Sequence, residues 1–115
     1  MNMNYYTSMN SSKGSLNIGD FIFSQIAQET LEDLAKDELK NAISLKLVKR
    51  RKNVEVLIEK NKVVVNVYFS AVRNSDVQKS VEAIQTGIYE ALNEATEIND
   101  IKVNVSVVSF VENDK

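Results

Sequence analysis

Two neighbouring runs of alternating valines constrain this chain more than any other feature. The segments VEVLIEK (54–60) and KVVVNVYFSAV (62–72) place an apolar residue at almost every second position and are separated by Asn61. An alternation of period two predicts strands that bury one face. A two-residue connection keeps the valines of both strands on the same face, and Asn61 tolerates the positive φ that such a turn requires. The two segments therefore predict a β-hairpin.

Three further segments carry strand patterns. SLNI (15–18) is a short candidate, and AISLKLVK (42–49) alternates apolar and polar residues. IKVNVSVVSF (101–110) alternates until two valines stand together at positions 107 and 108. We expect its regular apolar residues to face the core, with Val108 and Phe110 either on the opposite face or realigned by a bulge.

Two segments have the spacing of amphipathic helices. Gly19 and Asp20 offer an N-cap for a helix over residues 21–39. Ser75, with Gln78 three residues later, fits a capping box at the start of a second helix. Apolar residues recur on one side of each helix at spacings of three and four. In the first they are Phe23, Ile26, Ala27, Thr30, Leu31 and Leu34; in the second, Val77, Val81, Ile84, Ile88, Ala91 and Ala95.

These elements predict an α+β fold, with a mixed or antiparallel sheet and two helices packed mainly on one face. The order along the chain is β-α-β-β-β-α-β. A chain of 115 residues has room for one core. Residues 1–14 are rich in Asn, Ser, Tyr and Met without either period, so we expect a disordered polar tail there. Residues 15–112 form the single predicted domain.

The composition removes several kinds of chemistry. The chain has no histidine and no cysteine, which excludes Ser-His-Asp and Cys-His nucleophiles and thiolate zinc sites. The glycines are too scattered for a phosphate-binding loop, and we expect Gly87 to allow a close approach of the second helix to the sheet. Carboxylates stand among lysines, as in EDLAKDELK (32–40), which is typical of a solvated helix surface. We predict a non-enzymatic protein with no catalytic residue, cofactor or metal; an enzyme would need two acids converging in a pocket.

The sequence also bears on location. No apolar run approaches the roughly 20 residues of a membrane span. The N-terminal segment MNMNYYTSMNSSK has neither the basic start nor the apolar middle of a signal peptide. We expect a cytoplasmic protein with no direct membrane span.

One segment concentrates positive charge on a chain whose net charge is -2. It comprises Lys46, Lys49, Arg50, Arg51 and Lys52, with no acid nearby and no interleaved aromatic residue. Such a cluster can attract the phosphates of nucleic acid or of anionic lipid. The alternative is a charged turn that keeps an edge strand from pairing with neighbouring molecules.

A second candidate surface lies on the strand face opposite the main apolar face. Apolar residues there remain partly open if both helices cover only one side of the sheet, and they could then contact a partner or another copy of the chain. The alternative is that the N-terminal tail, or the first short strand with its loop, covers them. The residues are Val64, Tyr68, Val72, Val108 and Phe110.

Three of these segments, taken together, resemble a known protein family. The hairpin of alternating valines, the helix VQKSVEAIQTGIYEAL (77–92) and the strand IKVNVSVV (101–108) resemble the alkaline shock protein family. This family is also called the Gls or envelope stress response family, of Gram-positive bacteria and their relatives. The matching residues are Val77, Gln78 and Val81 in the helix, Thr96 and Ile98 in the turn, and Val103, Asn104 and Val105 in the strand. Glu97 stands where the family usually has glycine.

The resemblance spans roughly residues 15 to 111 and implies a function. Family members are associated with cell-envelope stress and homeostasis, and the resemblance implies a scaffold that acts through protein-protein contacts. It also implies cytoplasmic residence with recruitment to the membrane by a membrane-anchored protein partner. A homo-oligomer is compatible with this role. The rival reading is an RNA-binding protein that uses residues 49–52.

Overall fold

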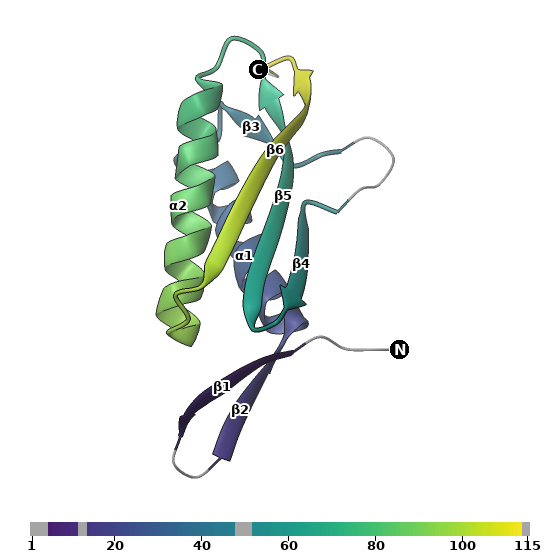
Figure 1. Cartoon of the computed structure of the whole chain (residues 1–115). Helices are drawn as coiled ribbons and strands as arrows, with labels where there is room; N and C mark the ends of the chain where they lie inside the picture. The colour runs from purple at the N-terminus through teal and green to yellow at the C-terminus, as the bar shows by residue number, and fades with distance from the viewer. Residues whose placement is uncertain (1–4, 12–13, 48–51, 114–115) are drawn as a thin grey trace.

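The computed structural model describes residues 5–11, 14–47 and 52–113, with side chains from residue 18 onward. These residues form two helices and six strands (Figure 1). In chain order the elements are β1 (Tyr5–Ser11), β2 (Gly14–Gly19), α1 (Asp20–Lys36), β3 (Ile43–Ser44), β4 (Val54–Glu59), β5 (Lys62–Val72), α2 (Val77–Thr96) and β6 (Ile101–Val111).

The long strand β5 is the centre of the main sheet. Along one side it pairs antiparallel with β4 and, further on, with the short β3, so that these two strands lie end to end. Along its other side β5 pairs with β6 in parallel. The sheet is therefore mixed, and the predicted α+β class and element order are confirmed (Figure 1).

The hairpin formed by β4 and β5 follows its sequence pattern. Glu59 pairs with Lys62, and Lys60 and Asn61 between them have φ of 48° and 59°. Two consecutive positive φ values match the right-handed twist of the flanking strands. The register places Val56 opposite Val65, so the predicted shared face is confirmed.

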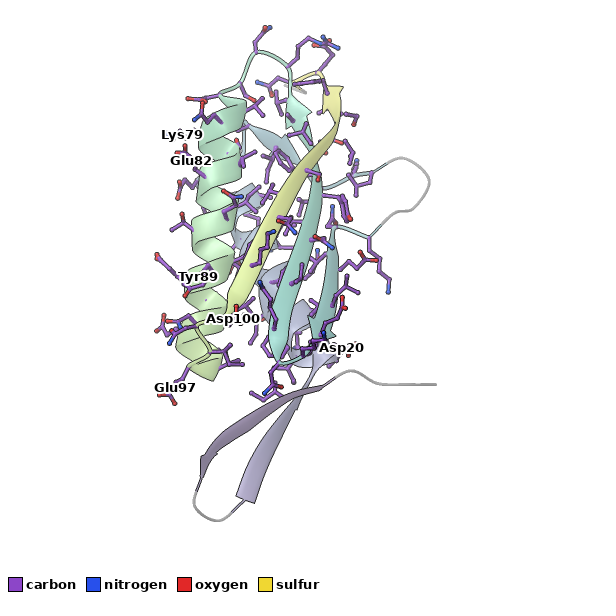
Figure 2. All side chains as sticks on the ribbon, in the orientation of Figure 1. Asp20, Lys79, Glu82, Tyr89, Glu97 and Asp100 are labelled. Carbon is purple, nitrogen blue, oxygen red and sulfur yellow. The ribbon has the colours of Figure 1, made fainter. Side chains whose placement is uncertain are left out.

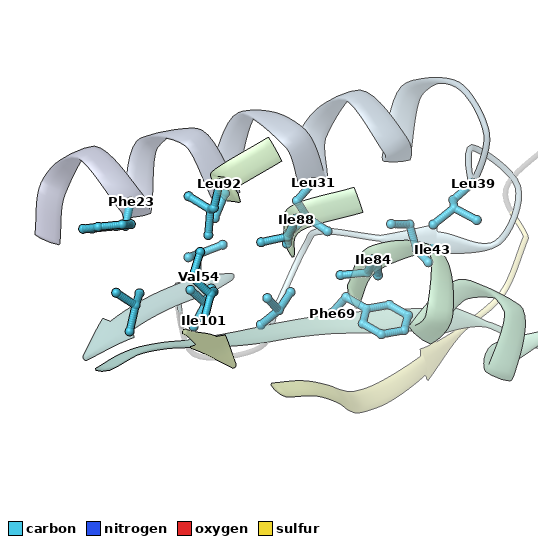
Figure 3. Close-up of a cluster of buried hydrophobic side chains, with 14 of the residues drawn as sticks. Phe23, Leu31, Leu39, Ile43, Val54, Phe69, Ile84, Ile88, Leu92 and Ile101 are labelled. Atoms are coloured by element: carbon cyan, nitrogen blue, oxygen red, sulfur yellow. The ribbon is translucent and has the colours of Figure 1, made fainter. Parts of the chain in front are cut away.

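The core lies between this face and both helices. Phe69 and Ile88 have no exposed surface, and Figure 3 shows side chains of α1 and α2 meeting those of the sheet. Each fully buried valine, leucine or phenylalanine contributes roughly 1.5–3 kcal/mol of transfer free energy. The fully buried core residues are Phe23, Ala27, Leu31, Val63, Val65, Val67, Phe69, Ala71, Ile84, Ile88 and Leu92.

The N-cap and the buried face of the second helix differ slightly from the prediction. Its N-cap is Asp76, whose carboxylate accepts a hydrogen bond from the Lys79 amide at 3.1 Å. Ser75, the predicted cap, instead donates its hydroxyl to the carbonyl oxygen of Val72. The buried stripe runs through Ser80, Ile84, Ile88 and Leu92; the predicted Ala95 is exposed.

Two positions in α2 concern glycine, Gly87 inside the helix and Glu97 at its C-terminus. A β-carbon at Gly87 would lie 3.4 Å from Leu34 Cδ1 and 3.7 Å from Thr30 Cγ2. Gly87 therefore faces α1, and the expectation that it approaches the sheet is wrong. At the C-terminus of α2, Glu97 adopts a φ of 60°, a conformation that favours glycine.

Two strand predictions need correction. The pattern predicts a strand over 42–49, but within the described part of that segment, 42–47, only Ile43–Ser44 pairs with β5; residues 48–49 lie outside the described residues. Residues 45–47 are not part of a strand; instead, the Leu45 carbonyl oxygen accepts from Asn53 Nδ2 and the Lys46 carbonyl oxygen accepts from Ser70 Oγ. Within the expected tail, Tyr5–Ser11 forms β1 and pairs antiparallel with β2. Its polar sequence has no period-two apolar pattern, because this hairpin extends away from the core rather than covering it (Figure 1).

The break at Val108 is a β-bulge. Phe69 pairs with Val107, and the next pair joins Ser70 to Ser109. Val108 is the extra residue, as expected for a bulge. Beyond it Phe110 pairs with Ala71, whose side chain is in the core. The bulge thus returns Phe110 to the phase of the helix-covered face.

Candidate functional site

The sheet has a face that neither helix covers within the described residues. We call it the open face, and it consists of residues in opposite phase to the core valines. Leu57 is 41% exposed, and Val64 beside it and Tyr68 further along β5 are half-buried. The open face comprises Glu55 and Leu57 of β4, Val64, Asn66 and Tyr68 of β5, and Lys102, Asn104 and Ser106 of β6.

Polar side chains form a row across the middle of the open face. Asn104 Nδ2 donates to Asn66 Oδ1 at 3.0 Å, and Asn66 Nδ2 donates to Glu55 Oε1 at 3.5 Å. The row crosses all three long strands. It leaves the second hydrogen-bonding capacity of each amide directed at solvent or a partner.

An apolar row lies beside the polar one. Leu57, Val64 and the methylene chain of Lys102 share one line across the strands, as their pairing requires. Tyr68 lies on the other side of the polar row, at the register of Ser106. An apolar patch next to hydrogen-bonding groups is the composition of a protein contact surface.

The predicted partner-contact residues do not all gather on this face. Val64 and Tyr68 do, as expected. Val72 is 7% exposed, so it is already buried and unavailable. Val108 and Phe110 are 38% and 54% exposed, but the bulge separates them from the other three.

The far end of the same sheet side is closed by the chain after β3. Ser70 Oγ donates to the carbonyl oxygen of Lys46 at 3.2 Å and shares a 2.7 Å contact with Ser109 Oγ. Ser70 is 1% exposed. The cover comes from residues near 46, and neither the N-terminal tail nor the first strand was needed for it.

A groove runs beside the outer edge of β4. It has a volume of about 520 Å³ and lies between the N-terminal end of α1 and the strand. Phe21, at 66% exposed the most open large apolar residue among those described, forms one wall. Val54 and Val56 form the other, with Asp20 and Lys52 also in the lining.

The basic segment is only partly described. Lys46 and Lys52 are exposed; Lys49, Arg50 and Arg51 lie outside the described residues. This segment belongs to the connection between β3 and β4, and the two ends of that connection form its base. The base is pinned, because Asn53 Nδ2 donates to the carbonyl oxygens of Leu45 at 2.9 Å and Tyr68 at 3.0 Å. The two described lysines therefore stand on either side of a pinned base.

The described acids do not converge on one site. Figure 2 shows Asp20, Glu82 and Glu97 at separate places on the surface. No group of three or more possible metal ligands occurs in the part of the chain that the structure describes. Among the same residues, neither helix combines the length and apolar character of a membrane span.

Sequence reasoning missed two contributors to these surfaces. Leu57 was overlooked although hairpin register places it opposite Val64, and extending the predicted pairing by one step would have found it. Phe21 lies off the buried stripe of α1, and no sequence signal marks it as part of a groove.

Comparison with family models, curated proteins and solved structures found no match to this chain.

Proposed function

We propose that this protein is a non-enzymatic scaffold that binds protein partners through the open face. The observation that carries the proposal is the one-sided packing of the helices. It leaves Leu57 41% exposed, with Val64 half-buried beside it and Tyr68 half-buried across the polar row. Exposed apolar surface beside hydrogen-bonding groups is favourable to bury against a partner, because the partner can cover the apolar side chains and also bond the amides of the polar row.

The polar row adds specificity to this contact. Asn66 is held from both sides by Glu55 and Asn104, so its amide has a fixed orientation before binding. Preorganised polar groups lose less conformational entropy on association. A partner is selected by whether its own donors and acceptors match this row.

The cellular role that we propose follows from the resemblance to the alkaline shock family. The protein would reside in the cytoplasm, take part in the envelope stress response and be recruited to the membrane by an anchored protein partner. The open face supports this proposal because it offers a docking surface of the kind that such recruitment needs.

A pull-down with matched variants tests the proposal. Ser106→Arg places a bulky cation on the open face, whereas Glu90→Arg changes an exposed residue of α2. We expect wild type and Glu90→Arg to recover a membrane-anchored protein from cells grown in normal or alkaline medium, and Ser106→Arg to lose it. Equal recovery by all three proteins contradicts docking through the open face.

The alternative function is RNA binding through residues 49–52. It is favoured by the exposure of Lys46 and Lys52 on either side of the pinned base. Such binding would weaken steeply with salt and be lost in an Arg50→Glu, Arg51→Glu variant. If that variant binds RNA as wild type does, or if neither binds, the alternative is excluded.

A further inference from the structure

The outer edge of β4 carries backbone groups that no strand pairs with in the part of the chain that the structure describes. Hydrogen-bonded and non-hydrogen-bonded residue pairs alternate along an antiparallel hairpin, starting from the hydrogen-bonded pair that closes a two-residue turn. Here that pair is Glu59 with Lys62. The 2.7 Å bond from the Tyr68 amide to the Asn53 carbonyl oxygen has the same phase. The backbone N–H and C=O groups that point away from β5 are therefore those of Val54, Val56 and Ile58.

This edge differs from the opposite edge of the sheet. On the β6 edge, Gln85 Nε2 of α2 donates to the Val103 carbonyl oxygen at 3.4 Å; just before β6 begins, Tyr89 donates to the Asn99 carbonyl oxygen at 3.1 Å. No strand pairs with the outer side of β4 within residues 5–11, 14–47 and 52–113. Two exposed apolar residues flank it, Phe21 on the helix side and Leu57 on the open face.

We propose that this edge pairs with β4 of a second copy of the chain. The two strands run antiparallel about a two-fold axis, with Val56 opposite Val56 of the other copy. The two four-stranded sheets then form one continuous sheet, and both α1 helices lie on the same side of it. The proposal goes beyond the proposed partner binding, because it uses the outer backbone edge of β4 rather than the side chains across the open face.

Hydrogen bonding selects this register. With Val56 on the axis, Val54 lies opposite Ile58 of the other copy, so all three outward residues of each strand meet outward residues. The two neighbouring registers place Val56 opposite Val54 or opposite Ile58 of the other copy. Each of them leaves one outward residue of each strand without an outward residue of the other strand opposite it. A shift by one residue sets outward groups against inward ones.

Charge selects the same register independently. With Val56 on the axis, Glu55 lies opposite the apolar Leu57 of the other copy, and Glu59 lies opposite Asn53. The two neighbouring registers place Glu55 opposite either Glu55 or Glu59, and directly opposed like charges destabilise a strand pair. Lys52 does lie opposite Lys60, but beyond the hydrogen-bonded stretch, where Lys60 has turned away with a φ of 48°.

Matched charge variants at Leu57 test the pairing. Leu57→Glu sets two carboxylates opposite each other on both sides of the axis, and Leu57→Lys sets an ammonium against Glu55. By sedimentation equilibrium we expect Leu57→Glu to raise the dimer dissociation constant about two- to thirty-fold and Leu57→Lys to lower it. Ser106→Arg, away from this edge, should leave it unchanged. A wild-type monomer at every attainable concentration overturns the proposal, as does a dimer indifferent to both charges at Leu57.

Cross-linking tests the register. The chain has no cysteine, so Glu55→Cys and Leu57→Cys chains, mixed and oxidised, can form only engineered disulfides. Their pair is a closely spaced non-hydrogen-bonded one, whose geometry suits a disulfide. We expect the mixed disulfide to exceed either homodisulfide, and a Lys102→Cys control, at a position that is also exposed, not to cross-link. A dimer that links through Lys102→Cys, or without the mixed preference, refutes the proposed axis.

Discussion

Replacing Asn53 should loosen the junction between β3 and β4. Its side-chain amide makes two hydrogen bonds, to the carbonyl oxygens of Leu45 and Tyr68. A hydrogen bond contributes a net 0.5–1.5 kcal/mol, roughly, to folding. Both carbonyl groups are only part-buried, so water can replace some of what Asn53→Ala removes. We expect a loss of about 1–2 kcal/mol in the free energy of unfolding.

The isosteric variant separates hydrogen bonding from packing. Asn53→Asp keeps the shape of the side chain but turns the two donors into acceptors that face carbonyl oxygens. We expect it to lose at least as much stability as Asn53→Ala. The exposed Asn41→Ala is the control, with a change within about 0.5 kcal/mol.

Urea unfolding followed by circular dichroism measures these differences. The slope with urea should stay constant while the midpoint falls, because only stability has changed. If Asn53→Asp unfolds at the urea midpoint of the wild type, the Asn53 amide does not stabilise the junction between β3 and β4. The base of the basic segment is then not pinned by Asn53.

Three further stability measurements test the packing. Val65→Ala, at a fully buried position, should lower the free energy of unfolding by about 2–3 kcal/mol, whereas Val64→Ala on the open face should lower it by less than about 1 kcal/mol. Equal losses would contradict the packing of both helices on the Val65 face. Gly87→Ala should raise stability by up to about 1 kcal/mol, because the added carbon meets Leu34 at ordinary contact distance, and a loss would indicate tighter helix packing. Glu97→Gly should raise the melting temperature, since a left-handed non-glycine residue costs roughly 1–2 kcal/mol; an unchanged melting temperature contradicts this.

The hairpin and the helix-covered face could be predicted because local rules determine both. Period two fixes which side of β4 and β5 is buried, and the two-residue turn fixes their register. The same alternation misled at 42–49, where Leu45 and Leu47 follow the pattern without a strand to pair with. The local pattern does not distinguish the two cases, because the Leu45 carbonyl oxygen is bonded by Asn53 from across the junction, and the sequence of 42–49 does not contain that contact.

The candidate surfaces were predictable only in part. Val64 and Tyr68 follow from the phase of β5, whereas Phe110 does not, because the bulge at Val108 shifts the phase beyond it. Val72 has the correct phase, yet it is buried at the end of β5 where its amide donates to the Ala42 carbonyl oxygen just before β3. Exposure depends on such long-range covering, which a single strand pattern does not contain.

Thiol labelling inside cells is the most direct test of the open face as a docking surface. In a chain without cysteine, Ser106→Cys reports on the open face and Glu90→Cys on the outer surface of α2. We expect both purified proteins to react readily, and only Ser106→Cys to be protected in the cell, where its partner covers it. Equal labelling of the two sites in cells would contradict the claim that this face is occupied.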